Sequence, residues 1–141
     1  MEIRALLVEA LRSIEKARRI HVPRSDVEES ALRWELYTAF QNTLDALAMI
    51  VSDLGLRKPS SYADLGVVMF EAGVLNAADR DTVARIARIR NSLAYSYRRL
   101  SLEDLKTVVE KFLPELEAFV NKLMAICNNR NLDPSRDAAK A

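Results

Sequence analysis

The sequence predicts an all-α protein, an up-and-down antiparallel bundle of four long helices plus a short one. Hydrophobic residues make up 50% of the 141-residue chain, and they recur at the three- and four-residue steps that place them on one face of a helix. The chain has only three Gly and four Pro residues, too few for the many tight turns of a sheet protein. We expect one domain, a helical bundle at residues 1–127, followed by a mobile tail at residues 128–141.

The first two predicted helices are joined by a short turn. The first begins at Ile3 and ends near the turn His21–Pro23. The second starts after Ser25, which is expected to form a capping box with Glu28, and it continues toward Leu54–Gly55. Its apolar residues lie on most of its circumference, which favours contacts with the bundle on one side and with a second subunit on the other. This pattern favours a homo-oligomer.

The third and fourth predicted helices each have a start signal. Ser61 can cap a short third helix, with Asp64 in its first turn, and Gly73 ends it. Asn76 is a suitable N-cap for a fourth helix that continues to Tyr97, with aspartates near the positive end of its dipole.

The last predicted helix begins after Ser101 and contains Pro114, which should kink it or remove one backbone hydrogen bond without ending it. Periodicity stops after Cys127, which we expect in the core as a small hydrophobic residue. The apolar residues form a heptad-like seam of Leu102, Leu105, Val109, Phe112, Leu116, Phe119, Leu123 and Ile126.

Composition excludes several classes of function. A formal net charge of +1 gives no overall attraction to nucleic acids or membranes, so such binding would need a local patch. One Cys and one His cannot form a Cys/His zinc cage, and no metal or other cofactor is predicted. No apolar segment has the ~18–20 residues of a membrane span, and the N-terminus looks like an amphipathic helix rather than a signal peptide. A soluble, cytoplasmic protein is expected.

Arginines are concentrated on the predicted fourth helix. Residues 80–99 contain no lysine and only Asp81 as an acidic residue, and their arginines are Arg80, Arg85, Arg88, Arg90, Arg98 and Arg99. A guanidinium group binds phosphate through two N–H groups, which suits RNA or a nucleotide. The alternative is a solvated helix face that forms ion pairs with acidic neighbours.

The octet RNSLAYSY, from Arg90 to Tyr97, lies within this stretch. Arg90 and Tyr97 are two helical turns apart and share a face, while Asn91 and Tyr95 share the adjacent one. Spacing alone also fits two core tyrosines beside an ion-paired arginine. No Ser/His/Asp set, paired carboxylates or Gly-rich phosphate loop supports another enzyme class.

This octet resembles the signature of HEPN domains of the HepT-like group, in which Arg-Asn, three small or apolar residues, His, one residue and Tyr close the penultimate long helix. The segments Trp34–Phe40, Pro59–Tyr62 and Glu71–Leu75 follow the order of that group, and the similarity covers residues 2–124. The resemblance implies a dimeric, metal-independent endoribonuclease toxin. It also implies a minimal nucleotidyltransferase antitoxin as partner, which in some systems attaches AMP to the motif tyrosine.

The resemblance implies a role for each motif residue. Arg90 would stabilise the scissile phosphate of an RNA such as tRNA, Asn91 would orient the site, and Tyr97 would accept AMP. Further RNA contacts are expected from Arg85, Arg88, Arg98 and Arg99.

Tyr95 stands where the family has its catalytic histidine. An imidazole titrates near neutrality, whereas a phenol, with an ordinary pKa of ~10, is a poor base at neutral pH. We therefore expect RNA binding with weakened or lost cleavage, in which Tyr95 donates a hydrogen bond or stacks on a base. His21, the only histidine, is expected to be a capping or surface residue rather than a replacement.

Two other functions remain open at this point. The first is a non-catalytic binding module that associates with a minimal nucleotidyltransferase and helps it hold a nucleotide substrate. The second is a helical assembly domain whose dimer surface is the apolar face of the second helix.

Overall fold

The computed structural model describes residues 2–95 and 100–132, and every regular element in these two ranges is a helix. The all-α fold class is therefore confirmed. In chain order the elements are α1 (Ile3–Ile20), α2 (Asp26–Asp53), α3 (Tyr62–Glu71), α4 (Ala77–Tyr95), α5 (Leu102–Thr107), the π-helical turn η1 (Val108–Phe112) and α6 (Leu113–Arg130). The last three follow one another without interruption and act as one long helix, so the described residues form four long helices and the short α3.

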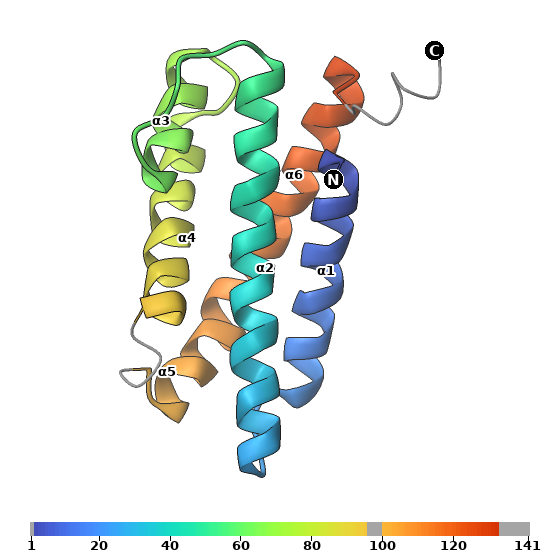
Figure 1. Cartoon of the computed structure of the whole chain (residues 1–141), viewed down its shortest axis with the longest axis vertical. Helices are drawn as coiled ribbons and strands as arrows, with labels where there is room; N and C mark the ends of the chain where they lie inside the picture. The colour runs from blue at the N-terminus through green and yellow to red at the C-terminus, as the bar shows by residue number, and fades with distance from the viewer. Residues whose placement is uncertain (1, 96–99, 133–141) are drawn as a thin grey trace.

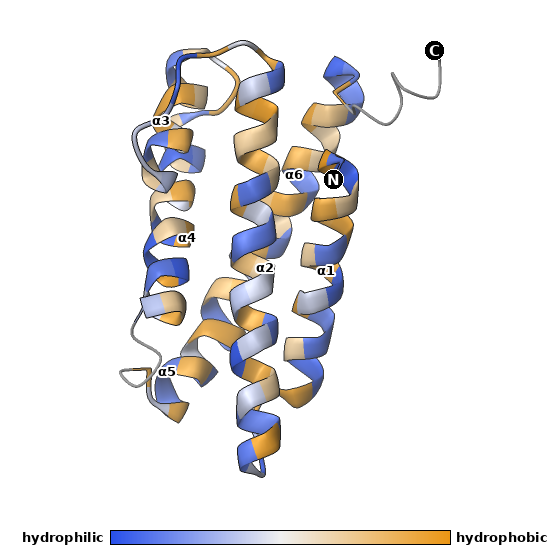
Figure 2. Cartoon of the chain, in the orientation of Figure 1, coloured by the Kyte–Doolittle hydropathy of each residue, from blue (hydrophilic) through white to orange (hydrophobic). Residues whose placement is uncertain are grey.

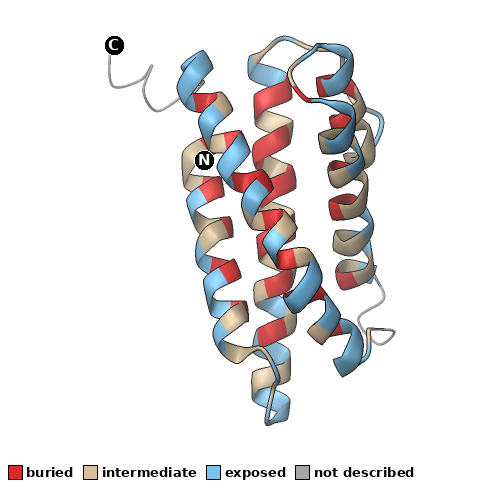
Figure 3. Cartoon of the chain, turned by 180° about the vertical axis from the view of Figure 1, so that it is seen from behind, coloured by how far each residue is buried: buried red, intermediate tan, exposed pale blue. Residues whose placement is uncertain are grey.

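The long α2 lies at the centre of the bundle. Figure 1 shows α1 and α4 on either side of α2, with consecutive long helices running in opposite directions. The last helix passes behind α2, and Figure 3 shows it crossing the bundle from the other side. The short α3 packs mainly against α4. This arrangement is the up-and-down bundle that the sequence predicts.

The predicted cap residues lie at the starts of the helices, and the hydrogen bonds at one of them differ from the prediction. Ser25 Oγ accepts a hydrogen bond from the Glu28 amide (3.1 Å), but the Glu28 carboxylate accepts from the Arg24 amide (2.9 Å) instead of that of Ser25. The predicted capping box is therefore only half formed. At α5 the box is complete, because Ser101 Oγ and the Asp104 carboxylate each accept from the other residue's amide.

The caps of α3 and α4 agree with the prediction. Ser61 Oγ accepts from the Asp64 amide (3.1 Å), and Asn76 Oδ1 accepts from the Asp79 amide (2.8 Å). Gly73 follows the end of α3 with a φ of 75°, a conformation that side chains other than glycine rarely adopt.

Pro114 does not end the last helix and does not divide it into two. The preceding residues form the π-helical turn η1, and α6 follows it directly. A wider turn accommodates the missing N–H and the bulk of the proline ring. The helix continues through Arg130, beyond the end of the hydrophobic periodicity at Cys127, and Asn131 follows it with a φ of 58°. Residues 133–141, most of the predicted tail, lie outside the described residues.

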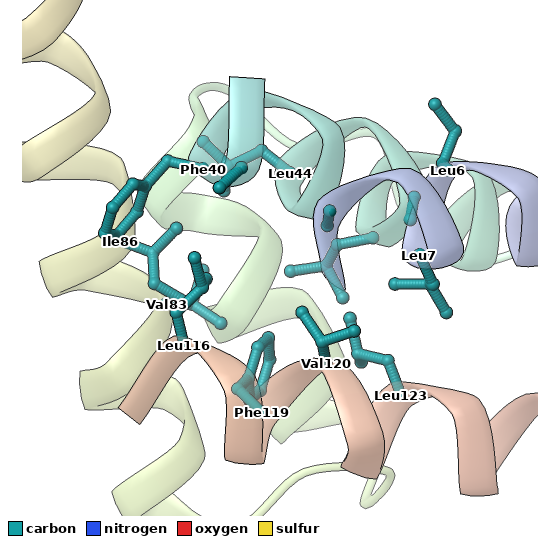
Figure 4. Close-up of a cluster of buried hydrophobic side chains, with 14 of the residues drawn as sticks. Leu6, Leu7, Phe40, Leu44, Val83, Ile86, Leu116, Phe119, Val120 and Leu123 are labelled. Carbon is teal, nitrogen blue, oxygen red and sulfur yellow. The ribbon is translucent and has the colours of Figure 1, made fainter. Parts of the chain in front are cut away.

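The hydrophobic core lies between α1, α2, α4 and the last helix. Orange segments turn toward the inside of the bundle in Figure 2, and Figure 3 shows the same faces as buried. Figure 4 draws the centre of this core, to which the four helices contribute Leu6, Leu7, Phe40, Leu44, Val83, Ile86, Leu116, Phe119, Val120 and Leu123. Burying one large apolar side chain contributes about 1.5–3 kcal/mol, so this core supplies most of the stability that positions the helices.

Most of the predicted seam of the last helix is buried, and so is Cys127. Leu102 is an exception with 49% exposure, while Phe112 and Ile126 are only partly buried. These three residues lie at the start, in the π turn and near the end of the helix, respectively.

One side of α2 faces away from the bundle. Trp34 is 61% exposed and Val27 is 79% exposed in the single chain, so the second contact surface predicted for this helix is not covered by other parts of the described chain. The expected homodimer remains a prediction. No helix in the described ranges is both long and apolar enough to cross a membrane.

Candidate functional site

Arg90, near the end of α4, is held by a side chain from α2. Its Nε donates a hydrogen bond to Gln41 Oε1 (2.6 Å), and its Nη1 donates to Oδ1 of the neighbouring Asn91 (3.0 Å). Gln41 is held in turn, because its Nε2 donates to Asp45 Oδ1 (2.7 Å) one turn further along α2. The guanidinium group thus has a fixed orientation through an uncharged partner.

Three tyrosine rings lie around the same guanidinium group. Arg90 Cζ is 4.9 Å from the ring centroid of Tyr62, 5.2 Å from that of Tyr95 and 5.9 Å from that of Tyr37. These distances are within the range of cation–π attraction. The Tyr62 hydroxyl also accepts a hydrogen bond from Gln41 Nε2 (3.3 Å). Tyr95 is 76% exposed, so most of its side chain remains accessible while it contacts Arg90.

The surroundings of Arg90 favour its charged form. Partial burial acts to lower the pKa of Arg90, but the combined interactions with Tyr95, Tyr37 and Tyr62 outweigh it and the net direction is upward. Because a guanidinium group is already protonated at all physiological pH values, the site keeps one positive charge whatever the pH.

A pocket of about 610 Å³ opens beside Arg90. Its walls come from the loop before α3, the first turns of α3, and α4, with one contribution from α2. Arg90, Asn91 and Tyr95, the three predicted catalytic residues, all line it, and so does the exposed Arg88. The structure therefore brings these four predicted residues together.

Arg85 lies elsewhere on α4. Its Nε donates to both Glu115 carboxylate oxygens, Oε1 at 3.1 Å and Oε2 at 3.2 Å, which connects α4 to α6. This hydrogen bonding lowers the pKa of Glu115 and raises that of Arg85. Arg85 does not line the pocket. The predicted residues Tyr97, Arg98 and Arg99 lie outside the described residues.

His21 is also separate from the pocket. It follows α1, and its Nε2 lies 2.7 Å from Glu110 Oε2 in η1. Within residues 2–95 and 100–132 no group of three or more His, Cys, Asp or Glu side chains is placed to hold a metal ion.

Gln41, Tyr37 and Tyr62 are site residues that sequence reasoning missed. The spacing of Gln41 and Asp45 places them on one face of a helix, and this much is visible in the sequence. Nothing in the sequence pairs Gln41 with Arg90, which is 49 residues further along the chain. Tyr62 belongs to a segment that carries the family resemblance, but only the structure shows its ring beside Arg90.

Comparisons with known proteins show the family of the chain. Residues 6–123 match the family model described as "Ribonuclease HepT-like", and the chain therefore belongs to the HepT-like ribonuclease family. It is 27% identical over 124 residues to a protein of Archaeoglobus fulgidus named "Putative RNase", a match that covers 83% of this chain and 89% of that protein. A second protein of that name and organism is 27% identical over 97 residues, covering 69% of this chain and 70% of that protein.

Solved structures share the fold at lower identity. The tri-AMPylated HEPN toxin of Shewanella oneidensis, in complex with MNT antitoxin, superposes with a TM-score of 0.75 and 17% identity, covering 87% of this chain and 96% of that chain. YutE of Bacillus subtilis, described as a cytosolic protein of unknown function, has a TM-score of 0.71 and 17% identity, covering 90% and 92%. At these identities the similarity concerns the fold alone.

Proposed function

We propose that this protein is an RNA-binding, metal-independent endoribonuclease toxin whose cleavage is weakened or lost. The observation that carries the proposal is Arg90, held by the uncharged Gln41 at a pocket that Asn91 and Tyr95 also line. A cation oriented by a neutral partner keeps its charge for a phosphate group. Family membership and the two archaeal relatives named as RNases support the assignment to RNA.

Metal-independent cleavage requires attack of the RNA 2′-hydroxyl oxygen on the adjacent phosphorus and departure of the 5′-oxygen. Arg90 would stabilise the charge that develops on the phosphate oxygens, and Asn91 would keep the guanidinium group oriented. One group must take the 2′-hydroxyl proton and another must protonate the leaving oxygen. Tyr95 can donate a hydrogen bond, but a phenol is a poor base at neutral pH, so cleavage should be slow.

The test replaces Tyr95 with histidine. Tyr95→His should increase the rate of RNA cleavage by ~10²–10⁴-fold, because a general acid–base group typically contributes that factor. The measurement is the initial rate with tRNA in the presence of EDTA. Tyr95→Phe is the matched control, since it retains the ring and supplies no titratable imidazole. The proposal would be contradicted if Tyr95→His cleaved no RNA and the wild type showed no salt-dependent RNA binding.

We further propose that the active form is a homodimer in which the motifs of both copies line one cleft. The exposed face of α2 around Trp34 supports this arrangement, because a large exposed aromatic side chain is typical of a contact surface. RNA contacts from Arg88, Arg98 and Arg99 would widen the basic surface, whereas Arg85 is paired with Glu115. Light scattering of the purified protein gives the oligomeric state directly.

A second candidate function is a non-catalytic module that binds a minimal nucleotidyltransferase. Tyr95 in place of histidine favours it, and the similar HEPN toxin of Shewanella oneidensis was solved with MNT antitoxin. In this case the two proteins should co-purify, and Tyr97 would be the AMP acceptor. Mass spectrometry should show an AMP increment that Tyr97→Phe abolishes. A pull-down without association would argue against this function.

A further inference from the structure

The pocket beside Arg90 is lined largely by small apolar side chains. Ala48 comes from α2, Ala63 from α3, and Ala84 and Ala87 from successive turns of α4. Because these side chains are short, they leave a volume of about 610 Å³, which is within the ~300–1,000 Å³ of typical small-ligand sites. The pocket therefore combines apolar walls with cationic and amide groups.

The loop wall of the pocket is held in place by Arg57. Its Nη1 and Nη2 donate to the two carboxylate oxygens of Asp64 at 2.8 and 3.0 Å, and its Nε donates to Glu71 (2.9 Å). Asp64 also accepts from the amide of Ser60, a pocket residue (2.9 Å). The hydrogen bond from Arg57 holds the pKa of Asp64 well below its usual range, so the carboxylate stays ionised. A wall held by hydrogen bonds within the protein lowers the entropic cost of binding.

The helices beside the pocket are in direct contact. A Cβ added to Gly66 of α3 would lie 2.7 Å from Val83 Cβ of α4, so the two helices pack there without space for a side chain. Arg80 stacks on Phe70, its Cζ 4.6 Å from the ring centroid, and connects the same pair of helices. The pocket thus lies beside a closely packed pair of helices, α3 and α4.

We propose that this pocket binds one unpaired nucleobase of an RNA strand whose adjacent phosphate lies on Arg90. A nucleotide combines a flat, largely apolar base with an anionic phosphate. The pocket presents the matching groups, alanine walls next to the guanidinium of Arg90 and the exposed Arg88. The exposed Tyr95 offers a ring on which a neighbouring base can stack. This assignment rests on the proposed RNA-binding function and adds the class of substrate.

The base must be unpaired to enter. In a duplex both faces of a base are stacked and its Watson–Crick edge is paired, so insertion would require flipping at a cost of a few kcal/mol. Single-stranded loops and ends present splayed bases without that cost. The expected preference is therefore for unpaired RNA over a duplex of the same length.

The test fills the pocket without changing charge. Ala84→Leu should weaken binding of an unstructured 2′-O-methyl oligouridine by about tenfold, the typical effect of losing one base contact. It should leave the already weaker binding of the same strand with abasic sites unchanged. Ala78→Leu, an exposed position on the same helix, is the matched control. Ala63→Leu fills the pocket from α3 in case the first variant does not fold, and thermal unfolding checks both.

The outcomes separate this proposal from the proposed function. If the wild type binds oligouridine and its abasic counterpart equally, the RNA function stands and the base pocket is wrong. The same holds if Ala84→Leu and Ala63→Leu bind like the wild type, or if they change the oligomeric state instead of the affinity. If the wild type binds no RNA, both proposals fail together.

Discussion

Arg85 and Arg90 lie on one helix, α4, and their surroundings differ. Arg85 forms a two-point ion pair with the Glu115 carboxylate of α6. Arg90 is bonded to the Gln41 amide of α2, and among the described residues no carboxylate pairs with it. The first arginine is neutralised by its partner, whereas the second is oriented by a group that leaves its charge available.

The difference indicates how two similar residues in one arginine-rich helix serve different purposes. A partly exposed ion pair between helices contributes at most about 1 kcal/mol, and it leaves the arginine little charge with which to attract a phosphate. An amide acceptor holds one N–H and directs the remaining N–H groups to a ligand. The partner of an arginine, rather than the arginine itself, therefore separates structural from ligand-binding positions.

Removing each arginine should give the largest contrast. In the Tyr95→His background, Arg90→Ala should reduce RNA cleavage by ~10²–10³-fold, the usual cost of losing a group that stabilises developing charge. Arg85→Ala should reduce it by less than tenfold and instead lower the unfolding free energy by about 1 kcal/mol. Initial rates with EDTA and urea unfolding measure the two effects. Equal losses of cleavage in both variants would show that the two arginines do not differ in function.

Changing the partner of Arg90 should convert it into a residue like Arg85. Gln41→Glu places a carboxylate against the guanidinium group, and RNA affinity should fall by about tenfold. The slope of log Kd against the logarithm of the salt concentration should decrease by nearly one, because one phosphate contact is lost. Gln41→Leu removes the bond without adding charge, so it should weaken binding less and leave the salt slope nearer that of the wild type. A larger loss in Gln41→Leu than in Gln41→Glu would contradict this account.

Changing the partner of Arg85 should have the smallest effect, and that effect should depend on pH. The hydrogen bond from Arg85 lowers the pKa of Glu115 in the folded state, so the pair stabilises the fold above 4.5, the ordinary glutamate pKa, and the stability is lost as the pH falls through the folded pKa. Glu115→Gln should therefore be less stable than the wild type near neutrality by about 0.5–1 kcal/mol, or a few degrees in Tm. The difference should vanish in acid, and a constant difference at all pH values would exclude this origin.

Helix positions were predictable because the signals that set them are local. Ser61, Asn76 and Ser101 cap helices as their sequence context indicates, since a cap needs only the next three residues. The half-formed box at Ser25 shows the limit of this reasoning, because the Glu28 carboxylate accepts from the Arg24 amide instead. The π turn before Pro114 was also missed, since several local distortions can accommodate a proline within a helix.

The sequence by itself determined the all-α class, the helix order and the motif residues Arg90, Asn91 and Tyr95, because hydrophobic period, caps and the octet are all short-range patterns. Only the tertiary structure decided which partner each arginine has. Gln41 meets Arg90 across 49 residues and Glu115 meets Arg85 across 30, and such pairings depend on how the helices pack around the core. The pocket also depends on tertiary structure, because its walls come from α2, α3, α4 and the loop before α3, which only helix packing brings together.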